Sequence, residues 1–134
     1  MMNHHAALIH TMVLMSAADR DMTDAEMSTI GDLVSHLPVF RDYDKSTIAK
    51  TASGCIDLLN GKDGLDGVLH AIKKALPDRF RETAYALACD VAAADGKVSQ
   101  EEARLLNLIR FELEIGKLVA AAIERGARAR HLTV

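Results

Sequence analysis

Four acidic residues occupy matching places in two similar segments of this chain. Asp19 and Glu26 are seven residues apart, and the same spacing recurs 76 residues later at Asp95 and Glu102. Carboxylate oxygens are the ligands that hard cations such as Ca²⁺ and Mg²⁺ prefer. The repeated spacing therefore predicts a divalent-cation site. Its predicted ligands are Asp19, Glu26, Asp95 and Glu102.

The two aspartates are expected at the C-terminal ends of helices, where the helix dipole is negative. A carboxylate placed there costs roughly 0.3–1 kcal/mol, and unpaired helix-end carbonyl oxygens lie nearby. A bound cation would relieve this repulsion. An all-oxygen site favours Ca²⁺ or Mg²⁺ over Mn²⁺ or Zn²⁺. The segment is not an EF-hand, because it lacks the glycine at loop position 6 and the glutamate at position 12.

A purely structural interpretation of the same acids stays open. Glu26 stands three residues after Thr23, and Glu102 three residues after Ser99. This spacing is that of a capping box, which starts a helix. An aspartate can likewise serve only as a turn residue that accepts from backbone amides. The alternative function is therefore a helical protein-interaction module whose acids are helix caps.

Apolar spacing with a period near 3.6 predicts the helices that position these acids. We expect seven, over about 3–18, 23–37, 44–59, 63–76, 78–94, 99–113 and 117–127. The segments 3–37 and 79–113 form an internal repeat of helical hairpins within one all-α domain, residues 1–134. Because the four acids continue the apolar stripes, we expect them to face inward at the open ends of the hairpins.

Composition and motifs argue against several functional classes. A net charge of −3, a pI near 6.0 and only 4% aromatic residues disfavour nucleic-acid binding. No HExxH, ExxH, GxSxG, phosphate-binding loop or GxGxxG occurs, so we expect no enzymatic activity. Cys55 and Cys89 lie in apolar helical patterns and are predicted to be buried free thiols.

Three further features concern charge and location. Asp90 borders an apolar helix face, and we expect it to pair with an Arg or Lys. The basic end of the chain, from Arg125 to His131, is expected to be a solvated helix end, with contact to an anionic surface as the alternative. No Lys or Arg precedes the apolar stretch 6–18, so we expect no signal peptide and a cytoplasmic location.

Two stretches of sequence resemble a known family. AAADGKVSQEEARLLNLI resembles the signature of the TerB-like family, named for a tellurite-resistance protein, and SAADRDMTDAEMSTIGDL resembles the other half of its duplicated pattern. The resemblance implies an all-α duplicated fold and a role in the tellurite or stress response. It also implies acidic residues proposed to bind metal, which in this chain are Asp19, Glu26, Asp95 and Glu102, with Asp21 and Glu101 as weaker neighbours. The two copies differ at one place, where Arg20-Asp21 of the first aligns with Gly96-Lys97 of the second. Arg20 and Lys97 could neutralise the acids without metal.

The resemblance also implies the kind of partner. Related domains occur beside J-domains in membrane-anchored co-chaperones. We therefore expect a protein partner in a membrane-associated stress complex. A homodimer of the chain is a separate expectation, and the charge and the low aromatic content predict no nucleic-acid partner.

Overall fold

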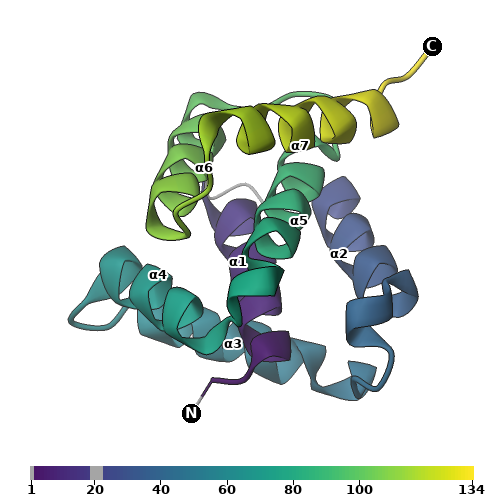
Figure 1. The fold of residues 1–134 in the computed structure, drawn as a ribbon. Helices are drawn as coiled ribbons and strands as arrows, with labels where there is room; N and C mark the ends of the chain where they lie inside the picture. The colour runs from purple at the N-terminus through teal and green to yellow at the C-terminus, as the bar shows by residue number, and fades with distance from the viewer. Residues whose placement is uncertain (1, 19–22) are drawn as a thin grey trace.

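Seven α-helices make up most of the computed structural model, which describes residues 2–18 and 23–134. The helices are α1 (His4–Ala17), α2 (Asp24–His36), α3 (Ile48–Leu59), α4 (Gly64–Ala75), α5 (Arg81–Ala93), α6 (Gln100–Glu112) and α7 (Lys117–Arg130). Short 3₁₀ turns cover Pro38–Phe40, Lys45–Thr47 and Asp78–Phe80. No strand occurs in these two stretches. The predicted all-α class and the number of helices are confirmed (Figure 1).

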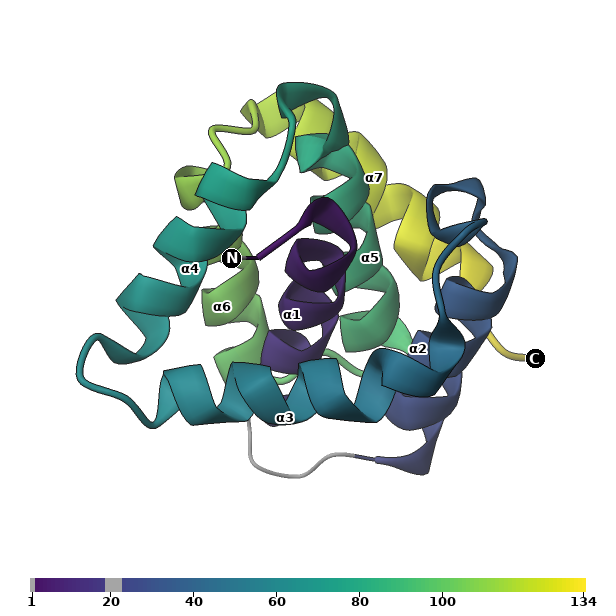
Figure 2. The same cartoon turned by 90° about the horizontal axis from the view of Figure 1, so that it is seen from below.

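Helix α1 lies in the middle of the molecule. It contacts α2, α3, α4, α5 and α6, which surround it in Figure 2. Every residue from Ala7 to Ser16 is buried, so this part of α1 has no solvent-exposed face. By their spacing alone, Leu8, Met12 and Met15 form one apolar stripe on this helix. In the structure the other faces are buried as well, because neighbouring helices enclose α1 on all sides.

The two repeated hairpins pack against each other. Helix α5, the counterpart of α1 in the repeat, runs beside α1 through the centre of the fold (Figure 1). Each of these inner helices also contacts the outer helix of the other hairpin, so α1 touches α6 and α5 touches α2. This arrangement buries both apolar stripes in a shared core, as expected for hairpins that cannot bury them alone.

The starts of α2 and α6 are confirmed as capping boxes, with Thr23 and Ser99 as N-caps. Three other boundaries differ from the prediction by three residues or more. Asp78–Phe80 form a 3₁₀ turn, so α5 begins at Arg81 instead of near residue 78. The residues before Ile48 form a 3₁₀ turn, so α3 begins later than expected. Helix α7 continues to Arg130 instead of ending near residue 127. Helix ends are the positions where local signals are weakest, because the last turns fray between α and 3₁₀ geometry.

Two apolar residues, Met27 and Ile56, have the spacing of the helix stripes but are exposed. Met27 is 51% exposed and Ile56 is 42% exposed. On α2 the buried positions are Glu26, Ile30 and Val34, four residues apart, so the inward face is centred one position before Met27.

Among the described residues, no helix combines the length and apolar character needed to cross a membrane.

Candidate functional site

The fold brings Glu26 and Glu102 together. Each is the third residue of its helix, in the first turn of α2 or α6, and each is only 2% exposed. The two side chains are close enough that Glu26 affects the ionisation of Glu102. The sequence placed these residues at equivalent positions of the repeat, and the structure makes them neighbours. We refer to them as the buried carboxyl pair.

The capping boxes determine how the buried carboxyl pair is held. Oε1 of Glu26 accepts a hydrogen bond from the Thr23 amide at 3.0 Å, and Oε1 of Glu102 accepts one from the Ser99 amide at 3.0 Å. In return, the Thr23 and Ser99 hydroxyl oxygens each accept from the amide of their glutamate at 3.1 Å. Both carboxyl groups are therefore fixed by local backbone contacts, and each has used one oxygen.

The second oxygen of Glu102 has no partner. Oε2 of this residue is buried and accepts no hydrogen bond from a described donor while both acids are ionised. The Glu26 carboxyl beside Glu102 can hydrogen-bond to it when one of the two acids is protonated. Burial raises the pKa of Glu102, the Ser99 amide works against that rise, and the neighbouring Glu26 carboxyl adds to it; the result is a pKa of about 7. A buried polar atom left unpaired costs about 1–3 kcal/mol. The site therefore favours a proton or a cation at this oxygen.

The other predicted ligands are placed differently. Asp95 is exposed and accepts a hydrogen bond from the Lys97 amide at 3.2 Å, so the expectation that it faces inward is wrong. It follows the end of α5, where Gly96 has a φ of 85° and turns the chain away from the core. Glu101 is exposed as well. Asp19 and Asp21 lie outside the described residues.

The described residues alone do not complete a metal centre. No three His, Cys, Asp or Glu side chains come together in residues 2–18 and 23–134 with the geometry to hold an ion. The buried carboxyl pair does fit a hard cation in chemistry, because it offers oxygen donors, two acidic groups and one unpaired oxygen. An ion there would supply positive charge between two buried acids.

Asp90 has the basic partner that its position predicted. Its carboxylate lies 2.7 Å from Nη2 of Arg130 and 3.3 Å from Nε2 of His131, and its side chain is only 10% exposed. This contact ties the end of α7 to α5. Two residues of the basic chain end therefore have a structural role that the sequence did not indicate, because the contact joins residues 40 positions apart.

The cysteines are buried free thiols, as predicted. Burial raises the pKa of both Cys55 and Cys89 to about 12, so both thiols are protonated at neutral pH. This state does not suit a nucleophile.

Comparison with known families agrees with the two motifs. A sequence model of the family described as "Tellurite resistance protein TerB" matches residues 5–124. The match begins in α1, ends in α7 and includes both capped helix starts. No curated protein matches the chain. No solved structure matches it either.

Proposed function

The chain belongs to the TerB family, and from this membership we propose that it is a non-enzymatic protein that binds a divalent cation at the buried carboxyl pair. Glu26 and Glu102 would serve as charge-neutralising oxygen donors. Asp19 would act as a further donor, and Asp95 would join the site only by turning inward from its exposed position. Helix-end carbonyls and water would complete the ligands. Ca²⁺ and Mg²⁺ suit this all-oxygen set better than Mn²⁺ or Zn²⁺.

One observation carries this proposal: the unpaired, buried Oε2 of Glu102 beside a second acidic group. A helix cap needs only one carboxyl oxygen, and Oε1 already supplies it at 3.0 Å. The cap therefore does not account for Oε2. Above pH 7, where Glu102 loses its proton, a cation would satisfy this oxygen and offset the repulsion within the pair.

The cellular role is proposed from the family. A cation-dependent change in stability suits a component of the tellurite or stress response, acting in the cytoplasm beside a partner in a membrane-associated complex. The proposal concerns binding and includes no reaction.

The test is a thermal melt of the metal-stripped protein titrated with Ca²⁺, Mg²⁺, Mn²⁺ and Zn²⁺. A cation that binds only the folded state raises the melting temperature; at 100 times its Kd it contributes about 2.7 kcal/mol. Glu102→Gln should abolish this response. Glu101→Gln is the matched control, because it removes the same charge from an exposed position one residue away.

The alternative proposal is the interaction module, in which the acids are only caps. The two observed capping boxes support it. In that case no cation raises the melting temperature specifically, and Glu102→Gln and wild-type protein respond alike. Asp95→Asn separates the two cases further, since it should weaken cation binding if Asp95 is a ligand and have little effect if it only accepts from Lys97.

A further inference from the structure

A groove with a volume of about 720 Å³ lies between α5, α6 and α7. Its apolar lining includes Ala92 of α5, Val98 of the following loop, and Ala103 and Leu106 of α6. Small side chains on the packed helices leave the space open. The volume falls within the roughly 300–1,000 Å³ typical of pockets for small ligands. The buried carboxyl pair is not part of this lining.

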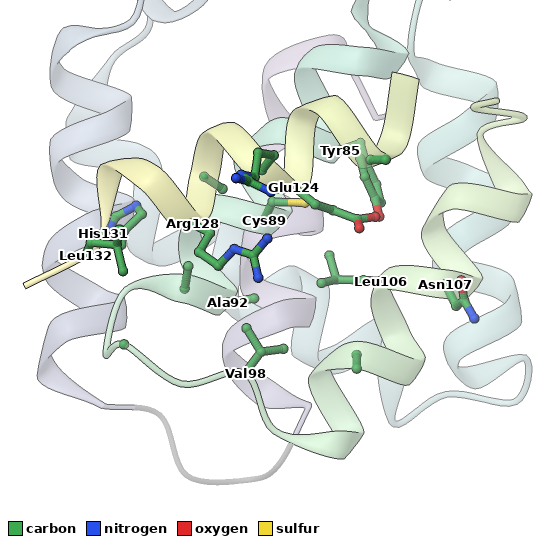
Figure 3. A pocket seen from close by; sticks show the side chains of 16 residues that line it. Tyr85, Cys89, Ala92, Val98, Leu106, Asn107, Glu124, Arg128, His131 and Leu132 are labelled. Atoms are coloured by element: carbon green, nitrogen blue, oxygen red, sulfur yellow. The ribbon is translucent and has the colours of Figure 1, made fainter. Parts of the chain in front are cut away.

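The charged residues of the groove come from α7. Figure 3 shows Tyr85 and Glu124 toward one end and His131 and Leu132 toward the other, with Arg128 between them. The Arg128 side chain extends from α7 toward the loop that carries Val98 (Figure 3). A guanidinium group therefore lies beside an apolar surface.

The basic charge in the groove is not neutralised by the described residues. Arg125 and Arg128 line the groove from the same side of α7, three residues apart. Neither is within ion-pair distance of a carboxylate in the described part of the chain, whereas nearby Arg130 is paired with Asp90. The one acid in the lining, Glu124, accepts a hydrogen bond from the Tyr85 hydroxyl.

An apolar groove with free guanidinium groups is complementary to an anion that carries an apolar tail. Guanidinium groups bind carboxylates with paired hydrogen bonds, and the alanine and leucine surface would cover a hydrocarbon chain. We propose that this groove binds a medium-chain fatty carboxylate, with its head at Arg128 and Arg125 and its tail along Ala92, Val98, Ala103 and Leu106.

The shape of the surface favours a small amphiphile over an acidic protein partner. A stable protein interface covers about 800 Å² on each partner and is centred on large apolar or aromatic side chains. Phe111 of α6 and Leu118 of α7 are exposed and lie outside the groove, whereas the exposed large apolar residues within its lining are Val98 and Leu132, neither of them aromatic. Five alanines and one glycine contribute to the lining of the groove, which suits a narrow chain.

The test is calorimetric titration of the full chain with decanoate, kept below its micelle concentration. We expect saturable binding of one molecule per chain. Arg128→Gln should weaken binding by about tenfold or more, the effect of losing one charged hydrogen-bond donor. Arg104→Gln is the matched control. It removes the same charge, and Arg104 is exposed on α6 and does not line the groove.

Two further comparisons test the tail. Octanoate should bind more weakly than decanoate, by up to about fourfold for each methylene removed. Ala103→Phe should block binding by filling the groove; Ala103 is exposed, so this change leaves the core intact. Circular dichroism confirms that each variant is folded, and Arg128→Gln alone suffices if Ala103→Phe fails to fold.

Several results would overturn the proposal. One is the absence of saturable decanoate binding. Another is equal affinity for acetate and decanoate, which would indicate a simple anion site. A third is equal loss of affinity in Arg128→Gln and Arg104→Gln, which would indicate nonspecific attraction. Tight binding of an acidic peptide without binding of decanoate would assign the groove to a protein partner instead.

Discussion

Replacing Glu102 with glutamine isolates the charge of the buried carboxyl pair. Glutamine has nearly the same shape as glutamate, and its amide oxygen can still accept from the Ser99 amide, which Oε1 of Glu102 does at 3.0 Å. The cap of α6 is therefore retained. What is removed is a buried group whose ionised form is disfavoured by burial and by Glu26.

The sign of the effect follows from the raised pKa. The pKa of Glu102 is about 7 in the folded protein against an ordinary value of 4.5, so the folded state binds this proton more tightly than the unfolded state. The associated stability is fully present below about pH 4.5 and is lost as the pH rises through 7. One pKa unit corresponds to about 1.4 kcal/mol. The whole rise therefore corresponds to roughly 3.5 kcal/mol, as an upper bound.

Urea denaturation of metal-stripped wild type and Glu102→Gln, at pH 5 and pH 8, measures this contribution. From pH 5 to pH 8, we expect the free energy of unfolding of the variant to rise by about 1–3 kcal/mol relative to that of the wild type. Other titrating groups, including His10, affect both proteins and cancel in the difference. Added Ca²⁺ or Mg²⁺ at pH 8 should restore the stability of the wild type and leave the stability of the variant unchanged.

The reasoning would be refuted if the difference in free energy of unfolding between wild type and Glu102→Gln were the same at both pH values. That result would mean that the ionised Glu102 carries no penalty, and that the pair is adequately solvated or neutralised in the folded protein. Glu101→Gln supplies the baseline, because removing an exposed charge one residue away should give a small difference with little dependence on pH.

Three other outcomes are expected, each measured by denaturation at controlled pH. Arg130→Ala should lower stability by about 1.5–3 kcal/mol, because it leaves the Asp90 carboxylate buried without its 2.7 Å partner. Leu87→Ala should cost about 2–5 kcal/mol, since Leu87 is 2% exposed, whereas Leu118→Ala, at a position 88% exposed, should change stability by less than about 0.5 kcal/mol. Burial lowers the pKa of His10, so its contribution to stability is lost as the pH falls below about 6.5; His10→Leu should reduce this acid sensitivity, and an unchanged pH slope would contradict it.

Features that depend on neighbours in the chain could be predicted from the order of residues alone. The two capping boxes are of this kind, because Thr23–Glu26 and Ser99–Glu102 are contacts over three residues. The number of helices followed from apolar periodicity and from stop signals such as Gly96. The repeat also related Glu26 to Glu102, since equivalent positions in two hairpins are visible as a matching spacing.

Helix packing decides which of these positions meet and which face solvent. It places Glu26 against Glu102, pairs Asp90 with Arg130, and leaves Asp95 exposed. It also opens the groove between α5, α6 and α7, whose lining comes from segments as far apart as Tyr85 and Leu132. Contacts of this kind depend on how the helices pack in three dimensions, and a local pattern of residue types carries no information about the distance between helices.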